Sequence, residues 1–243
     1  MSGSPVVLSR RAVLRGALAS AATVAVGGAV AACTSSRQAE DAGRPSTTPA
    51  PSSTAAAEAS GASTTPTGAG GVLLAYFSRA GENYYYGGRR DLDVGNTEVL
   101  AGIISRLLGC DVYRIEAADP YPEDYEATVV RNVREQDADA RPAIANALPR
   151  LDRYETVLLA SPIWNVRAPM IMTTFTEALD FAGKTVHPVT TYAMSGLGTT
   201  ERDYAASCPG ATIAEGLAVQ GEEVAAAEPT VRAWLQRTGL RAR

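Results

Sequence analysis

Hydrophobic and polar residues alternate in blocks from about residue 72 onward, and the blocks predict strands and helices in turn. Continuous apolar runs are typical of strands buried on both faces, and three occur, at 72–77, 156–164 and 185–194. Two shorter segments with strand character lie at 110–117 and 211–219. Apolar positions at helical spacing predict five helices, at 96–109, 123–140, 169–182, 199–208 and 228–240.

Five strands that alternate with helices predict an α/β fold, in which one parallel sheet carries helices on both faces. In open sheets of this kind, ligands bind at the carboxyl ends of the strands. The loops after the first, third and fourth strands are therefore the expected place for chemistry.

Composition separates this domain from what precedes it. Residues 33–71 are mainly Ala, Ser, Thr, Pro and Gly, and they have too few apolar side chains to form a core. We therefore predict a disordered tether there. Residues 72–243 have the size of one domain with a single core.

The N-terminus, residues 1–32, has the pattern of an export signal. Arg10 and Arg11 resemble the twin arginines of a Tat signal, and the weakly apolar segment after them is too short to span a membrane. The segment ends in "VAAC", which resembles the recognition site of bacterial lipoproteins, so Cys33 is predicted to be lipidated. Simple cleavage after small residues is the alternative. The domain is expected at the outer face of the cytoplasmic membrane, or else secreted or periplasmic.

The loop after the first predicted strand is a candidate phosphate site. It starts as "YFSRAG" and ends as "GNT", and its candidate residues are Ser78, Arg79, Ala80, Gly95, Asn96 and Thr97. Small and hydroxyl residues let backbone N–H groups surround an anion, and the helix N-terminus adds a favourable dipole. A glycine turn with a helix cap at Asn96 or Thr97 would explain the same residues without a ligand. Neither a Walker loop nor a dinucleotide fingerprint is present, so a mononucleotide phosphate fits better.

An insert, "ENYYYGGRRDLDV", separates the two halves of this loop. Its tyrosines, with Arg89 and Arg90, could cover the site or meet a substrate or partner; a solvated loop with a "YGG" turn is the alternative. We expect Ser78 from the first half and Asn96 with Thr97 from the second half to hold the phosphate.

The loops after the third and fourth strands are candidates for a ring-binding slot. The third strand leads into "SPIWN", which comprises Ser161, Pro162, Ile163, Trp164 and Asn165. Trp164 would either pack on the core or form a flat wall for a ring-shaped ligand. The fourth strand leads into "MSGLG", where Ser195, Gly196 and Gly198 would border a ligand closely or form an ordinary turn.

As a set, these motifs resemble the flavodoxin-like family, in particular its bacterial flavodoxin-related FMN-binding branch, from about Val72 to Leu240. The resemblance implies a three-layer fold with strand order 2-1-3-4-5 and FMN held without a covalent bond. It implies that Ser78, Asn96 and Thr97 hold the phosphate, and that residues 161–165 and 195–198 border the ring. The insert departs from compact flavodoxins, whose first loop runs directly into the helix.

Charge and cysteine content argue against two classes of function, nucleic-acid binding and metal binding. The whole chain has a net charge of −4, and the residues after Gly71 carry 17 basic and 23 acidic side chains, without a basic stripe for nucleic acid. The spacing of Cys110, Cys208 and the single histidine, His187, does not suggest a metal site, and both cysteines are predicted to be free thiols.

The expected function is FMN-dependent redox chemistry at the cell envelope. A carrier that serves a redox partner protein and a reductase that uses NAD(P)H or a quinone, with a small-molecule acceptor, both remain open, and no catalytic residue is assigned. The alternative is a cofactor-free binding module anchored as a lipoprotein. A hydrolase is disfavoured, because neither Ser78 nor Ser195 lies in a Gly-x-Ser-x-Gly motif and His187 falls within a predicted strand.

Overall fold

The computed structural model describes residues 71–241. The predicted signal segment, the lipidation site Cys33 and the tether up to residue 70 lie outside the described residues. Gly71, predicted as the end of the tether, begins the first strand. Among the described residues no helix combines the length and apolar character that a membrane span requires.

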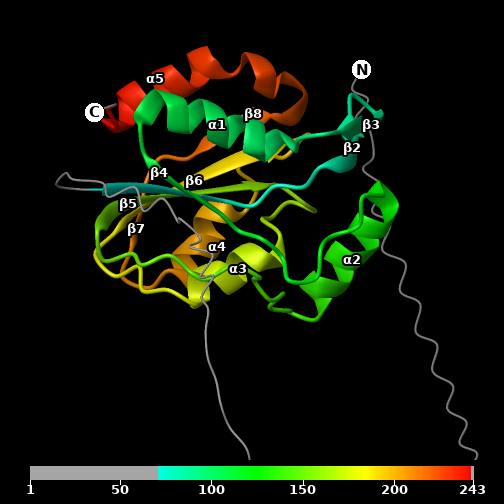
Figure 1. Cartoon of the computed structure of the whole chain (residues 1–243), viewed down its shortest axis with the longest axis horizontal. Coiled ribbons are helices and arrows are strands. Elements are labelled where there is room, and N and C mark those ends of the chain that lie inside the picture. The colour runs from blue at the N-terminus through cyan, green and yellow to red at the C-terminus, as the bar shows by residue number, and fades with distance from the viewer. Residues whose placement is uncertain (1–70, 242–243) are drawn as a thin grey trace, which may run out of the picture. The chain divides into compact units, whose positions relative to one another are not determined.

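A parallel sheet forms the centre of the domain (Figure 1). Its strands are β1 (Gly71–Tyr76), β4 (Asp111–Arg114), β5 (Tyr154–Pro162), β6 (Thr185–Tyr192), β7 (Thr212–Ile213) and β8 (Leu217–Gln220). The order is β4-β1-β5-β6, and both β7 and β8 pair with β6. With β7 and β8 at one position, this is the predicted 2-1-3-4-5 order, so the predicted fold class is confirmed.

The fifth strand was predicted as one piece, and the structure shows that this is wrong. Val186 O accepts a hydrogen bond from Ala214 N at 2.9 Å. The backbone nitrogen of Pro188, two residues further along β6, therefore faces the same neighbouring strand. Proline has no N–H to donate, and the ladder stops there. The carbonyl of Glu215 instead lies near His187 Nδ1 at 2.9 Å and accepts a hydrogen bond from Trp234 Nε1 at 3.2 Å.

Helices cover both faces of the sheet, as predicted (Figure 1). Alternate residues of β1 point to opposite faces. Leu74 belongs to a core shared with α1 (Asn96–Leu108) and α5 (Glu228–Thr238), and Leu73 to a core shared with α3 (Met170–Glu177) and α4 (Thr200–Ser207). A 3-10 helix that the sequence did not predict, η1 (Gly221–Ala226), leads from β8 to α5.

Helix α2 (Tyr125–Asp137) stands at one edge of the domain, beside the hairpin (Figure 1). Its buried contacts are polar. Arg131 Nε lies 2.7 Å from Glu135 Oε1, and Tyr121 donates to Glu135 Oε2 at 2.8 Å. Arg131 also donates to the carbonyls of Asp119 and Pro120. This buried cluster joins α2 to the loop that precedes it.

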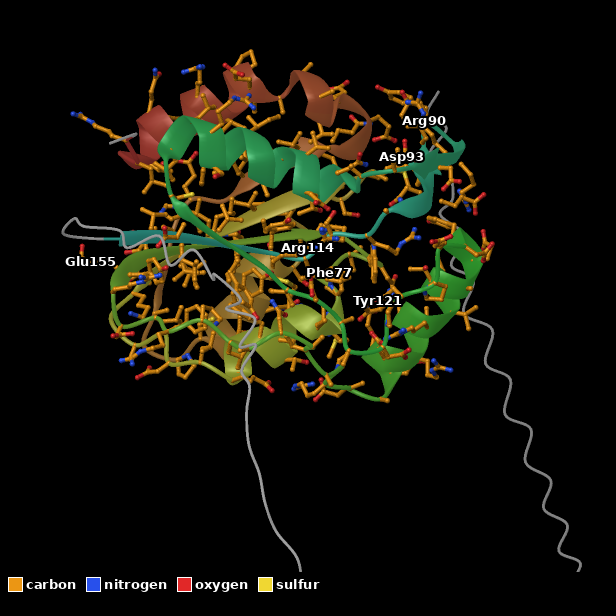
Figure 2. The ribbon with its side chains drawn as sticks, viewed as in Figure 1. Phe77, Arg90, Asp93, Arg114, Tyr121 and Glu155 are labelled. Carbon is orange, nitrogen blue, oxygen red and sulfur yellow. The ribbon has the colours of Figure 1, made fainter. Side chains whose placement is uncertain are left out.

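The insert is a β-hairpin whose turn falls within the predicted "YGG" segment and whose second strand is mostly exposed. Strands β2 (Gly81–Tyr85) and β3 (Gly88–Leu92) pair in antiparallel fashion around a two-residue turn. Tyr86 and Gly87 form that turn with φ values of 45° and 86°. Positive φ at both positions is the geometry of a type I′ turn, whose twist suits a hairpin. Figure 2 shows Arg90 and Asp93 on this outer part of the molecule.

Candidate functional site

A cavity of about 340 Å³ lies at the carboxyl ends of β1, β5 and β6. Three groups of residues line it. The strand-end loops and the start of α1 contribute Ser78, Arg79, Asn96, Thr97, Pro162, Ile163, Trp164, Asn165, Thr191, Tyr192 and Ala193. The hairpin and α2 contribute Asn83, Tyr84, Tyr125, Thr128, Val129, Asn132 and Val133. The segment after β8 contributes Gly221 and Glu222.

The two halves of the first loop meet despite the hairpin between them. Helix α1 starts after Gly95, and Ser78 Oγ accepts a hydrogen bond from Glu98 N at 3.1 Å. A Cβ on Gly95 would lie 2.4 Å from both Ser78 Oγ and Arg79 O, so only glycine fits there. The hydroxyl that caps α1 therefore comes from Ser78, rather than from Asn96 or Thr97 as the sequence suggested.

The first turn of α1 faces the cavity with polar groups. The first N–H groups of a helix have no partner within the helix and can serve an anion. Thr97 Oγ1 lies 2.7 Å from Thr191 Oγ1, and both side chains are buried. Asn96 packs against Gly221 at the start of η1. Hydroxyls and helix N–H groups at one end of the cavity suit an anion such as a phosphate.

Arg79 holds the start of the hairpin in place. Its guanidinium donates to the carbonyls of Pro122 at 3.0 Å and Glu123 at 2.9 Å, and to the carbonyl of Glu82. Burial lowers the pKa of Arg79. Its Nε is buried and has no hydrogen-bond partner among the described residues.

Trp164 packs on the core, as one of the two predicted alternatives had it, and also lines the cavity. It lines the cavity, and its ring also packs edge-on against Tyr121 at 5.1 Å and Phe77 at 5.7 Å between centroids. Figure 2 shows Phe77 and Tyr121 together near α2. Gln136 of α2 donates to the Trp164 carbonyl at 3.1 Å, which fixes the loop from the other side.

The second and third loops are in direct contact. Asn165 and Val166 have φ values of 50° and 64°, and Val166 O accepts a hydrogen bond from Thr199 N at 2.9 Å. A Cβ on Gly198 would lie 2.2 Å from Val166 O. Gly198 therefore allows these loops to pack together. A β-branched residue at positive φ is strained backbone, of the kind that accumulates at functional sites.

Six predicted site residues are not among those that line the cavity: Ala80, Gly95, Ser161, Ser195, Gly196 and Gly198. Ser161 is fully buried, and neither its hydroxyl nor that of buried Tyr204 has a hydrogen-bond partner among the described residues. Gly196 forms a turn with a φ of 56° and accepts a hydrogen bond from Thr190 through its carbonyl. Strand β6 ends at Tyr192, so Tyr192 and Ala193 occupy the position that the sequence assigned to Ser195 and Gly196.

The sequence suggested that the insert could cover the site, but it gave no cavity-lining role to α2. One signal was present, because Tyr125, Val129 and Val133 recur every four residues on an otherwise polar helix. The hairpin contacts the segment before α2 through Glu82 N, which donates to Glu123 O at 2.8 Å, and α2 itself through Glu82 Oε2, which accepts from Tyr125 N at 3.2 Å. On the other side, Tyr86 N donates to Glu222 Oε1 at 3.0 Å. The hairpin thus bridges α2 and η1.

The remaining reactive groups lie away from the cavity. Cys110 and Cys208 are free thiols, as predicted, and burial raises the pKa of each to about 11. His187 is buried in β6, and desolvation lowers its pKa. Within residues 71–241, no group of three or more His, Cys, Asp or Glu side chains could hold a metal ion.

The model of the flavodoxin family matches residues 92–238. The chain belongs to the flavodoxin family. Its sheet order, its two helical layers and its cavity at the strand ends agree with this membership. The match begins at the end of β3, so most of the hairpin precedes it.

Solved structures with the same fold include two bacterial proteins. One is described as a "putative flavoprotein" from Bacteroides uniformis, with 29% identity and a TM-score of 0.57 over 70% of this chain and 99% of that chain. Another with the same description, from Bacteroides eggerthii, has 28% identity and a TM-score of 0.56 over the same shares. The comparison with curated proteins found no match.

Proposed function

We propose that this flavodoxin-family protein binds FMN without a covalent bond and uses it for electron transfer or flavin-dependent reduction. The observation that carries the proposal is the cavity, which has an anion site at one end and an aromatic wall at the other. FMN combines a phosphate with a flat heterocycle, and these two halves of the cavity match it.

The anion end fits a phosphate because hydroxyl and amide groups gather at the N-terminus of a helix there. Ser78, Asn96 and Thr97 lie around the N-terminus of α1, where the helix dipole favours negative charge. Gly95 keeps the two halves of the loop close enough to act as one site.

The ring end fits a flat heterocycle. Trp164 presents an aromatic surface that is braced by Phe77 and Tyr121, and Ile163 and Asn165 lie beside it. Tyr192 and Ala193 border the cavity from the third loop.

FMN, when bound, supplies reversible electron chemistry, and the protein supplies position and environment. The chain's own residues then have three tasks. The start of α1 binds the phosphate, Trp164 orients the ring, and the hairpin with Tyr84 excludes water from part of the cavity. A net acidic domain disfavours additional negative charge on the ring and so lowers the reduction potential.

The first test is flavin binding by the purified full chain. Protein stripped of flavin is mixed with FMN or with riboflavin, which lacks the phosphate, and free ligand is removed. We expect retained flavin absorbance and quenched flavin fluorescence with FMN, and binding of riboflavin about a hundredfold weaker, because several charge-assisted hydrogen bonds are lost. A folded, colourless protein would contradict the proposal and favour the cofactor-free binding module.

We further propose that the domain works at the cell envelope as a lipoprotein. The support is the sequence pattern from Arg10 to Cys33, which lies outside the described residues. The test is the membrane fraction of cells that express the full chain. Cys33→Ala should move the protein from that fraction into the soluble one, and an unchanged distribution would reject lipidation.

A further inference from the structure

One row of residues on the cavity side of α2 is apolar, although Thr128 and Asn132 of the same helix also line the cavity. Tyr125, Val129 and Val133 are four residues apart, so they form one stripe about 12 Å long. The buried residues of α2 are instead Thr128, Arg131, Asn132 and Glu135. The two valines keep 38% and 40% of their surface exposed. The packing of α2 against the body therefore does not account for this stripe.

Aromatic side chains extend the stripe at both sides. Tyr84 reaches the cavity from β2 and pairs across the hairpin with Arg89. The Arg89 guanidinium lies 3.6 Å from the centroid of the Tyr125 ring, which ties the hairpin to the first turn of α2. Trp164 closes the opposite side, where Gln136 of α2 binds its carbonyl. Tyr84, Tyr125, Val129, Val133 and Trp164 together form what we call the outer slot.

Charges around the cavity limit what the slot can hold. Of the described lining residues, Arg79 and Glu222 are the charged ones. The terminal nitrogens of Arg79 donate to three backbone carbonyls, and Glu222 accepts from Tyr86 N. Neither is free to neutralise a second charged ligand. A dinucleotide would bring phosphates without cations to meet them, whereas an uncharged ring avoids that desolvation penalty.

The slot also offers a donor to a ligand oxygen. Asn132 lines the cavity and is almost fully buried. Its Oδ1 accepts a hydrogen bond from Gln136 Nε2 at 3.2 Å, so its NH₂ group is the part that can serve a ligand. An apolar slot with aromatic ends and one amide donor matches a flat ring that carries carbonyl oxygens.

We propose that the outer slot binds a flat, uncharged aromatic molecule of the quinone class, beside the flavin. This inference rests on the proposed function, because it places the molecule next to FMN. The phosphate-binding groups belong to the start of α1, and four of the five slot residues belong to α2 and the hairpin, so Trp164 is the one slot residue that the two ligands would share.

The test measures binding alone, with the flavin oxidised and no reductant present. The FMN-loaded full chain is titrated with 1,4-naphthoquinone by equilibrium dialysis, and retained FMN is read from its absorbance in the same samples. Val129→Asp and Val133→Asp place a carboxylate in the slot. Val130→Asp is the matched control, because Val130 lies on the same helix, is 65% exposed and does not line the cavity.

We expect the wild type and Val130→Asp to bind the naphthoquinone equally well. Each slot variant should raise its dissociation constant about tenfold while FMN is retained, because the new carboxylate must be desolvated. Val133→Thr, which keeps the shape of valine, should have a smaller effect in the same direction.

Three outcomes would overturn the proposal that the outer slot binds a quinone. One is FMN-loaded protein that does not bind the naphthoquinone, another is binding that the three aspartate variants affect equally, and the third is displacement of the naphthoquinone by added FMN. Failure of the FMN proposal looks different. The protein would then hold no flavin, and the response of naphthoquinone binding to Val133→Asp would still decide whether the slot exists.

Discussion

The two sides of the cavity are built in different ways. The inner wall consists of strand ends and the start of α1, where Ser78, Thr97 and Thr191 are all buried. The two threonine hydroxyls bond each other, and the Ser78 hydroxyl accepts a hydrogen bond from the first turn of α1. The outer wall consists of the hairpin and α2, which are attached through arginines and carboxylates. The fold itself therefore fixes the inner wall, whereas charged side chains hold the outer wall and can change without a change of fold.

The largest effect is expected at the buried cluster that anchors the outer wall. Arg131→Met leaves the Glu135 carboxylate buried without its partner and should lower the free energy of unfolding by about 3–5 kcal/mol. Urea denaturation of both proteins measures the difference. Arg134→Met, an exposed position on the same helix, is the control and should change stability by less than about 0.5 kcal/mol. Equal losses for both variants would show that the cluster does not anchor α2.

The inner wall should respond most strongly at Gly95. Gly95→Ala forces a methyl group against Arg79 O and Ser78 Oγ, so the unfolding free energy should fall by about 1–3 kcal/mol and FMN should bind more weakly. Gly102→Ala in the same helix meets nothing within 4 Å and should stabilise the protein by about 0.5–1 kcal/mol. Chemical denaturation and FMN titration measure both effects. If Gly95→Ala bound FMN normally, the phosphate site would not depend on the close contact between Gly95 and Ser78.

The exposed attachment of the hairpin should be weak and sensitive to salt. Arg89 lies 2.8 Å from Glu126, and the Glu126 side chain is 72% exposed. A double-mutant cycle with Arg89→Met and Glu126→Gln should give a coupling energy of about 0.2–1 kcal/mol that shrinks in high salt. A coupling above this range at high salt would mean that the hairpin is held as firmly as the inner wall.

The smallest effect is expected from the pH dependence of one ion pair, which joins Arg141, in the segment after α2, to Glu177 at the end of α3. Arg141 binds Glu177 at 2.5 and 2.8 Å and lowers the Glu177 pKa from its ordinary value of 4.5. A lowered pKa in the folded state stabilises the fold above pH 4.5, and that contribution is lost as the pH falls through the folded pKa. Glu177→Gln should therefore have a slightly lower Tm than wild type at pH 7, and the gap should close at acid pH. A gap that is constant from pH 7 to pH 3 would argue against this pairing.

The sequence predicted the inner wall better than the outer wall. Ser78, Asn96 and Trp164 could be found because they directly follow or precede recognisable strands and helices. Strand boundaries are less certain. The fourth strand was predicted to run to residue 194 but ends at Tyr192, so Tyr192 and Ala193 were not among the candidate residues although they line the cavity.

The outer wall depends on contacts between distant segments, which a local pattern does not reveal. The hairpin turn has Tyr86, rather than the usual Asn or Gly, at its first left-handed position, so "YGG" predicted a turn but not the paired strands around it. The break in the fifth strand depends on Pro188 of the neighbouring strand. The apolar stripe of α2 was visible in the sequence, but it was interpreted only as part of an amphipathic helix.

The contact between Ser78 and Gly95 has a consequence for how this domain can diversify. Because these two residues touch, the segment between them, residues 79–94, has its two ends at adjacent points of the fold. Its length and composition can be exchanged without moving β1 or α1, since a loop with adjacent ends adds little strain to the elements that flank it. Protein engineers could replace the hairpin to alter which molecules reach the cavity while the rest of the domain keeps its sequence.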